Sequence, residues 1–318
     1  MDLCGKKILF IGIGFYDYDA LIIAKLEAAG ANVTYICQEH QNRFVNQLTK
    51  ISFCRGIESR YSAKYLSGLV SNESGYDEVF VIKGSRLSPE YMNTLRLNNP
   101  MALFKLYQWD SIKRFEGDKR IFDFFDFVYS FDRIDCKNNS FTFVPLFFRQ
   151  KITRKSNYKY DLSFVGWLHF NRLRLLMNMS VELAKAQRTY KFYLFTGIKS
   201  WFVLNIVKGI KFIHRKTLPY SEYLQTLNDS DAVLDFHHPD QDGLTMRTIE
   251  ALGANRKIIT TNADVKNYDF YNENNVLVLE GESDVADIVE FVSKGYIEVP
   301  DNILDGYSLD SWLARIFN

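Results

Sequence analysis

The chain has few cysteines, and those that it has are scattered. They form no Cys-x-x-Cys pair and stand at Cys4, Cys37, Cys54 and Cys136. This spacing is typical of reduced cytosolic thiols, whereas disulfide frameworks and zinc sites need cysteines at short, recurring intervals. The pattern therefore argues against a disulfide-stapled secreted domain and against a structural zinc site.

Long apolar segments are also lacking. No apolar run approaches the roughly 20 residues that a bilayer-spanning helix needs. Lys6 and Lys7 lead into residues 8–12, ILFIG, which have the length of a strand and not that of the apolar region of a signal peptide. We therefore expect a cytoplasmic protein that is soluble or attached peripherally to the inner face of the membrane.

A charge excess of either sign is absent, because the formal net charge is +1 over 318 residues. A general nucleic-acid binder normally carries a clear basic excess, so this class of function is disfavoured. The balance conceals an asymmetry: residues 149–217 contain fifteen Lys and Arg and two acidic residues, whereas residues 218–318 contain six and nineteen. The basic segment predicts an anionic partner, either a nucleotide diphosphate or an anionic lipid surface, or else a solvated helical face.

Residues 199–216 of the basic segment mix large apolar side chains, among them Trp201 and Phe202, with five Lys and Arg. An amphipathic basic stretch of this kind can lie on an anionic membrane. The alternative is a buried helix followed by a strand, with the lysines facing outward. Both interpretations stay open at this point.

Two patterns that would indicate a cofactor or a metal are incomplete. Gly12 and Gly14 begin a dinucleotide-binding fingerprint, but Asp17 stands where the third glycine is required. His237 and His238 are adjacent, so they point in different directions from an extended chain, and no His-x-x-x-His or cysteine partner accompanies them. We therefore expect neither a bound cofactor nor a metal.

Length and element pattern predict two α/β domains. A chain of 318 residues with 47% hydrophobic content has enough apolar material for two cores. From residue 7 onward, apolar strand-like runs alternate with helical segments, as in a doubly wound parallel sheet. The polar, basic segment 149–158 is the best linker candidate. We expect an N-terminal domain over 1–150, a second domain over 151–308 and a final helix over 309–318.

Polar residues follow several predicted strands of the first domain. Lys83, Asp110 and Asp132 come after apolar runs, and Asp17 lies in the loop after the first run. Ligands of open α/β sheets bind beyond the carboxyl ends of the strands. Asp17 and Asp110 are therefore candidates for a catalytic base, although Asp110 could instead cap the helix that follows it.

The most informative stretch is residues 231–262, DAVLDFHHPDQDGLTMRTIEALGANRKIITTN. It predicts a buried strand, a polar loop, a helix that opens at Gly243 and ends near Gly253, and a second buried strand. The start of a helix beyond a strand end attracts phosphate through its free backbone N–H groups. Arg247 and Glu250, one helical turn apart, would then reach a phosphate and a ribose diol respectively.

This stretch also resembles a known family. The segments GLTMRTIEA at 243–251 and KIITTN at 257–262 resemble the donor site of GT-B glycosyltransferases, and most closely the CgeB-like group found among bacterial lipopolysaccharide and capsule enzymes. The Phe-Val-Gly that ends at Gly166 is similar to the end of the first strand in the second domain of that fold. The Tyr-x-Trp-Asp at 107–110 fits its first domain.

The resemblance implies two Rossmann-like doubly wound domains that face a cleft. It implies a metal-independent, hexosyltransferase-type enzyme that moves a sugar from a nucleotide sugar to a glycan or lipid-linked glycan in lipopolysaccharide (O-antigen or core) or capsule biosynthesis. Asp17 and Asp110 would supply catalysis from the acceptor-side domain. Together with the positions of Arg172 at a helix start and His238 at a strand end, it gives the donor-binding residues that we expect: Gly166, Arg172, His238, Gly243, Thr245, Arg247 and Glu250.

Two other functions stay open. A non-catalytic protein of the same fold would bind a nucleotide sugar or a glycan without turnover. A nicotinamide-dependent enzyme would use Gly12 and Gly14, but the missing third glycine makes it the less favoured alternative.

Overall fold

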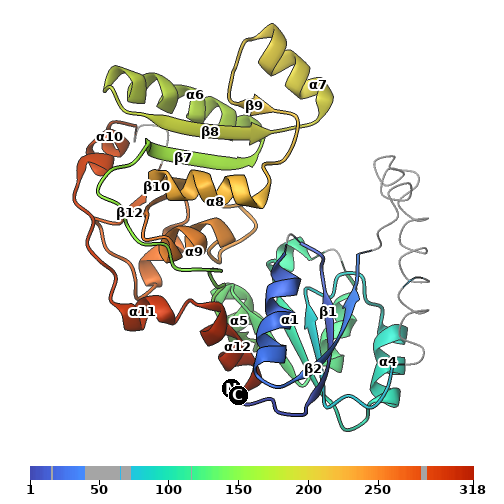
Figure 1. Cartoon of the computed structure of the whole chain (residues 1–318). Helices are drawn as coiled ribbons and strands as arrows, with labels where there is room; N and C mark the ends of the chain where they lie inside the picture. The colour runs from blue at the N-terminus through green and yellow to red at the C-terminus, as the bar shows by residue number, and fades with distance from the viewer. Residues whose placement is uncertain (16, 40–64, 66–72, 116, 281–284) are drawn as a thin grey trace. The chain divides into compact units, whose positions relative to one another are not determined.

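The chain is described by a computed structural model that covers all residues except 16, 40–64, 66–72, 116 and 281–284 (Figure 1). The described residues form two compact units. One unit comprises Met1–Pro145 and Leu313–Asn318, and the other comprises Leu146–Trp312. Helices that the sequence predicts over about 41–49 and 60–70 lie, apart from Tyr65, outside the described residues.

The first unit contains, in its described part, a six-stranded parallel sheet with helices on both faces. Its strands are β1 (Lys7–Gly12), β2 (Asn32–Cys37), β3 (Glu78–Ile82), β4 (Leu103–Gln108), β5 (Phe127–Ser130) and β6 (Thr142–Phe143). Its helices are α1 (Tyr18–Ala28), α4 (Pro89–Asn98), the short 3₁₀ segments η2 (Ile112–Arg114) and η3 (Lys119–Phe124), α5 (Arg133–Asn139) and the end of α12 (Leu309–Phe317).

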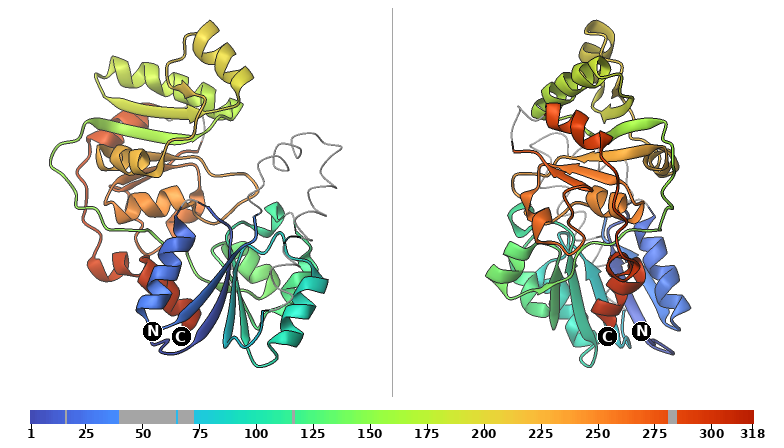
Figure 2. Two further views of the ribbon diagram at one scale, coloured as in Figure 1. Left: turned by 45° about the vertical axis from the view of Figure 1, so that its right-hand side comes forward. Right: turned by 90° about the vertical axis from the view of Figure 1, so that its left-hand side faces the viewer.

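The strand order of this sheet is β2-β1-β3-β4-β5-β6, so the chain changes direction of winding between β1 and β3. Odd-numbered positions of β1 and β3 pack under α4 in one core layer, where Met92 and Leu95 are fully buried. The opposite face lies under α1 and α12, and there Phe317 makes an edge-on contact with Phe80 (Figure 2). Since ligands of such sheets bind where the winding reverses, the carboxyl ends of β1 and β3 are the expected binding edge.

The second unit is built in the same way around a second six-stranded parallel sheet in the described residues. Its strands are β7 (Tyr160–Trp167), β8 (Tyr190–Phe195), β9 (Ile213–His214), β10 (Ser230–Asp235), β11 (Lys257–Thr260) and β12 (Val276–Val278). Its helices are α6 (Phe170–Lys185), α7 (Ile198–Trp201), the π-helical turns η4 (Phe202–Val207), α8 (Tyr220–Asn228), α9 (Met246–Gly253), the 3₁₀ segment η5 (Ala263–Asn267), α10 (Val285–Ser293) and α11 (Asp301–Asp305).

The order of the second sheet is β12-β11-β10-β7-β8-β9. This is the strand order of dinucleotide-binding folds, with the reversal of winding between β7 and β10. A continuous core that includes Leu176, Leu183 and Phe291 joins α6 and α10 to one face, and α8 and α9 cover the other (Figure 2). The carboxyl ends of β7 and β10 are therefore the expected binding edge of this unit.

Most predicted elements are present within a residue or two of their predicted bounds, but two differ at the candidate site. The helix predicted to open at Gly243 begins only at Met246, because Thr245 caps it by accepting a hydrogen bond from the backbone N–H of Thr248. Strand β7 continues through Gly166 to Trp167, so Gly166 lies within a strand paired with Leu194 and not in a turn. The short helix α11 was not predicted.

Candidate functional site

The carboxyl ends of β7 and β10 carry the site of the second unit. Asp235 is the last residue of β10 and is 1% exposed, although it follows a purely apolar run. A buried carboxylate must be hydrogen-bonded or paired with a cation to be stable. Its partners come from the loop and helix that follow the strand, so this one residue connects the strand end to the start of α9.

Three side chains of the α9 start converge on Asp235. One carboxylate oxygen accepts hydrogen bonds from the hydroxyl groups of Thr245, at 2.9 Å, and Thr248, at 2.8 Å. The other oxygen pairs with the guanidinium of Arg247 at 2.5 Å. The Arg247 side chain keeps 20% exposure, so its contacts do not enclose it completely. The arrangement presents a cation in a fixed orientation, as anion recognition requires.

Gly166 makes room for this arginine. A Cβ at position 166 would lie 2.9 Å from the Phe164 ring and 3.3 Å from an Nη atom of Arg247. The guanidinium lies 5.0 Å from the centroid of the same ring. Glycine is therefore required at this position by close packing, since its φ lies outside the left-handed region.

Arg172, on the first turn of α6, lies at the same strand ends. It donates a hydrogen bond of 3.1 Å to the backbone carbonyl of Phe236, the residue after β10. The neighbouring His237 is held by Thr261, whose hydroxyl lies 2.9 Å from Nδ1. Burial lowers the pKa of the His237 imidazole, although the nearby Asp235 and Asp242 carboxylates oppose part of the shift. His237 is therefore neutral at physiological pH.

The predicted ligand His238 is placed less firmly than His237. Its Nδ1 accepts a hydrogen bond of 3.1 Å from the backbone N–H of Asp240, which closes a turn, and its side chain is 38% exposed. Gly243 is buried, and its carbonyl accepts a hydrogen bond from Asn262 at 3.2 Å. Asn262 also binds the carbonyl of Asp242 at 2.9 Å and so holds the loop that precedes α9.

Glu250 lies one turn beyond Arg247 and is 2% exposed. It accepts a hydrogen bond of 3.4 Å from the hydroxyl of Tyr220, at the first turn of α8. Burial raises the pKa of the Tyr220 hydroxyl, and the negative charge of Glu250 adds to the rise. The guanidinium of Arg149 lies 3.8 Å from the centroid of the Tyr220 ring. Tyr220 thus contacts both Arg149, through its ring, and Glu250, through its hydroxyl.

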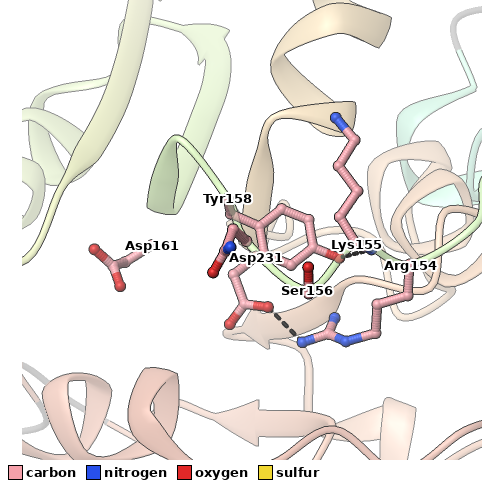
Figure 3. A pocket seen from close by; sticks show the side chains of 7 residues that line it. Arg154, Lys155, Ser156, Tyr158, Asp161 and Asp231 are labelled. Carbon is pink, nitrogen blue, oxygen red and sulfur yellow. Dashed lines mark hydrogen bonds and ion pairs between the residues drawn. The ribbon is translucent and has the colours of Figure 1, made fainter.

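A polar cavity of about 410 Å³ lies elsewhere in this unit, beside the amino ends of β7 and β10 (Figure 3). It is lined by Arg154, Lys155, Ser156, Asn157, Tyr158, Asp161 and Asp231. Arg154 pairs with Asp231, and Lys155 lies 3.5 Å from Asp229. These charges are paired within the protein, and the cavity lies where the linker passes the amino ends of the strands. Ligands of such sheets bind at the carboxyl ends, so this cavity is not the expected ligand site.

In the first unit, Asp17 and Asp19 occupy different environments. Asp17 is the N-cap residue of α1 and is exposed, but its side chain makes no capping hydrogen bond. Asp19 is buried, and its Oδ2 accepts hydrogen bonds of 2.7 Å from the hydroxyl of Tyr35 and from the backbone N–H of Gly14. Burial raises the pKa of Tyr35, and the Asp19 charge adds to the rise. Asp17 is therefore the carboxylate that faces solvent in this loop.

Asp110, two residues after the end of β4, is held between two cations. Lys83 Nζ lies 2.8 Å from one carboxylate oxygen, and Arg114 lies 3.6 Å from the other. Lys83 has a left-handed backbone with φ of 68°, which a residue with a side chain rarely adopts outside functional or tightly constrained sites. Asp132, the third polar residue predicted to follow a strand of this unit, is buried and caps α5.

Gln38 fills the crevice where the winding of the first sheet reverses. Its amide donates to the carbonyls of Gly12, at 3.1 Å, and Ile82, at 2.7 Å, and so joins the ends of β1 and β3. Gln108 donates in the same way to the Lys83 carbonyl at 3.1 Å. The amide oxygens of both glutamines, and Oδ1 of Asp19, are buried acceptors without a hydrogen-bond partner. The two glutamines therefore connect the ends of neighbouring strands at this edge.

The comparisons with known proteins agree with this geometry. Residues 178–298 match a family model described as glycosyl transferase-like. The second unit therefore contains a glycosyltransferase-like domain. The match covers less than half of the chain and includes Arg247 and Glu250, whereas Gly166 and Arg172 precede it. No curated protein matches the chain by sequence.

Solved structures resemble the whole chain in fold. AviGT4, a glycosyltransferase involved in avilamycin A biosynthesis, aligns with a TM-score of 0.59 and 10% identity over 98% of this chain and 95% of that one. The UDP-GlcNAc 2-epimerase from Neisseria meningitidis, bound to UDP-GlcNAc, aligns with a TM-score of 0.59 and 11% identity over 98% of both chains. Anabaena HepE, in complex with UDP and glucose, aligns with a TM-score of 0.57 and 11% identity over 98% of both chains. The fold is that of GT-B glycosyltransferases.

Several residues of the site were not singled out from the sequence. Asp235 was counted as part of an apolar strand, although a carboxylate that ends a buried strand was a usable signal. Arg149 was assigned to the linker, and Tyr220 only to a helix start. Asn262 was only part of a quoted segment. Their roles depend on contacts with residues 10 to 71 positions away in the sequence, which no local pattern encodes.

Neither a metal cluster nor a membrane span is found in the described part of the chain. Among the described residues, no group of three or more His, Cys, Asp and Glu is placed to hold a metal ion. No helix among them is both long and apolar enough to cross a bilayer. Independence from metal stays a prediction.

Proposed function

We propose that this protein is a glycosyltransferase that binds a nucleotide sugar at the carboxyl ends of β7 and β10. The observation that carries the proposal is the cluster of Arg247, Asp235 and Gly166 at the point where the winding of the second sheet reverses. It presents an oriented guanidinium beside a helix start. The glycosyltransferase-like match that includes Arg247 supports the same assignment.

In the proposed reaction, the bond between the sugar C1 and the diphosphate oxygen breaks, and a bond between C1 and an acceptor hydroxyl oxygen forms. The electron pair of the broken bond leaves with the nucleoside diphosphate. Arg247, the N–H groups at the start of α9 and Arg172 would stabilise the negative charge that builds on that leaving group. Glu250 would accept hydrogen bonds from the ribose hydroxyls. No metal is invoked in this scheme.

The proton of the acceptor hydroxyl needs a base, which we assign to the first unit. Asp17 is the exposed carboxylate in the loop after β1, and the oxygens of Asp110 face Lys83 and Arg114. We therefore favour Asp17 as the base and Asp110 as an acceptor-orienting residue.

We further propose that the acceptor is a glycan or lipid-linked glycan of bacterial lipopolysaccharide or capsule, modified on the cytoplasmic side. The support for this setting is the resemblance of residues 243–251 to enzymes of those pathways. UDP and UDP-GlcNAc, bound by structures of the same fold, are the first nucleotides to test.

Isothermal titration calorimetry of the full chain against UDP, GDP, dTDP and CMP tests nucleotide binding directly. We expect one of them to bind, and we expect Arg247→Ala to weaken its binding about 10- to 100-fold through loss of a charge-assisted contact. Arg215→Ala, which removes an exposed arginine of the same unit, is the control and should bind as wild type. Absence of binding to all four would refute the donor site.

Mass spectrometry of reactions with the corresponding nucleotide sugars separates transfer from other chemistry. A glycosyltransferase releases nucleoside diphosphate only when an acceptor takes the sugar or, slowly, when water does. A non-catalytic binder leaves the nucleotide sugar unchanged under all conditions. An epimerase, such as the Neisseria structure of the same fold, would instead yield an isomeric sugar without any acceptor.

A further inference from the structure

A lysine-rimmed apolar surface lies on α7 and η4, beside β9 at the edge of the second sheet (Figure 1). Five large apolar side chains on these two segments are exposed to solvent by about half or more. They are Ile198 at 60%, Phe202 at 53%, Val203 at 46%, Ile206 at 55% and Val207 at 68%. A contiguous exposed apolar patch of this kind on a helical segment marks an interaction site.

The helical segment is packed on its other side, so its exposed face does not result from a loose helix. Leu204 is buried in the core of the unit together with Ile213. Asn205 donates hydrogen bonds to the carbonyls of Ile210, at 3.1 Å, and Ile213, at 2.9 Å, which hold the segment against β9. The segment therefore has two apolar faces, and the unit covers one of them. The buried-helix interpretation of the sequence accounts for that face alone.

The charge along this segment of the chain has one sign. Between Glu182 and Glu222 the chain contains eight Lys and Arg and no acidic residue. Five of these cations are exposed within or beside the surface, and none of the five forms an ion pair with a described residue. They are Lys199, Lys208, Lys211, Arg215 and Lys216. Cations that lack acidic partners within the described residues favour an anionic partner.

We propose that the lysine-rimmed apolar surface docks on an anionic lipid bilayer. The apolar side chains would enter the boundary between headgroups and acyl chains, and the lysines would remain at the level of the lipid phosphates. A second copy of this chain is the poorer occupant, because it would bring an identical cationic rim against the first. The proposal does not depend on the glycosyltransferase activity, although a membrane-bound enzyme would meet a lipid-linked acceptor at its source.

Co-sedimentation of the full chain with sucrose-loaded vesicles tests the proposal. We expect binding to vesicles of equimolar phosphatidylglycerol and phosphatidylcholine to exceed binding to pure phosphatidylcholine at least tenfold. Added salt should weaken the difference by screening the lysines. If the wild-type chain fails to sediment with the anionic vesicles, the proposal is wrong.

Paired variants identify the surface. Ile206→Glu with Val207→Glu should lower vesicle binding at least tenfold, and Lys208→Glu with Lys211→Glu should remove the preference for anionic lipid. The matched control is Leu97→Glu with Met101→Glu, which changes two apolar residues that are 72% and 91% exposed in the first unit. It should bind as wild type. Circular dichroism of each variant establishes that it is folded.

Two further results would overturn the assignment. Equal binding by the folded Ile206→Glu, Val207→Glu variant and the wild type would place the lipid contact elsewhere. A dimer in analytical ultracentrifugation that the same variant converts to a monomer, together with no vesicle binding, would make the surface a contact between copies of this chain. Neither readout involves sugar transfer, so failure here leaves the proposed enzymatic function untouched.

Discussion

The guanidinium of Arg247 pairs with the buried carboxylate of Asp235 at 2.5 Å, across the junction between the end of β10 and the first turn of α9. The pair has both a structural and a functional consequence. It satisfies a carboxylate that is 1% exposed, and it leaves the arginine oriented toward the strand ends. The two consequences can be separated by changing each partner in turn.

Removal of the carboxylate should destabilise the fold. Asp235→Ala leaves Arg247, Thr245 and Thr248 without their shared acceptor, and we expect the free energy of unfolding to fall by about 2–4 kcal/mol. Urea unfolding followed by circular dichroism measures the change. Asp240→Ala, which removes a carboxylate that is 61% exposed in the following loop, is the control and should stay within about 0.5 kcal/mol of wild type. A loss no larger than that of the control would contradict the role of Asp235.

Crowding at Gly166 should weaken nucleotide binding more than it weakens the fold. The Cβ of Gly166→Ala would lie 2.9 Å from the Phe164 ring and 3.3 Å from Arg247, so both side chains must move, and we expect the dissociation constant to rise about tenfold. Calorimetry with the nucleotide that binds wild type measures this. Gly197→Ala is the matched control, because a Cβ there meets nothing within 4 Å. Equal affinities for the two variants would show that Gly166 does not shape the site.

The two carboxylates of the first unit should differ in their effects on catalysis. Asp17→Asn removes a solvent-facing base, so kcat should fall about 100-fold or more with little change in the acceptor KM. Asp110→Asn leaves Lys83 and Arg114 without their counter-ion, so we expect mainly a higher acceptor KM. Steady-state kinetics with a working donor and acceptor separates the two. Wild-type kcat for Asp17→Asn would exclude it as the base.

Stability should fall on mild acidification through His237. Burial lowers the pKa of this imidazole in the folded chain, whereas the unfolded chain takes up a proton near the ordinary value of about 6.5. Below that pH the unfolded state binds more protons than the folded state. The contribution of His237 to the free energy of unfolding is therefore fully present above about pH 6.5, and it is lost as the pH drops toward the folded pKa.

Urea unfolding between about pH 5 and 8 checks this dependence. His237→Gln keeps a polar group near Thr261 but cannot be protonated, so its stability should fall less steeply than that of wild type below pH 6.5. The same slope in both proteins would show that His237 does not contribute to the acid sensitivity.

The local pattern of apolar residues was enough to predict most helices and strands, because buried parallel strands appear in a sequence as short apolar runs between helical segments. The final helix, predicted over 309–318, is observed as α12 over Leu309–Phe317. The start of α9 was placed three residues too early, since its position depends on which residue supplies the cap. Thr245 supplies it, and its hydroxyl also donates a hydrogen bond to Asp235.

The sequence by itself determined two α/β units and a strongly basic segment, and its resemblance to a known family indicated the segment with Arg247 and Glu250. These follow from periodicity and composition, which act over a few residues, and from a short motif. Only the tertiary structure decided that Asp235 orients Arg247, that Gly166 makes room for it, and that residues 198–207 leave one apolar face uncovered. Such facts depend on which distant segments meet when strands 7 and 10 become neighbours, and strand order is a property of the folded chain alone.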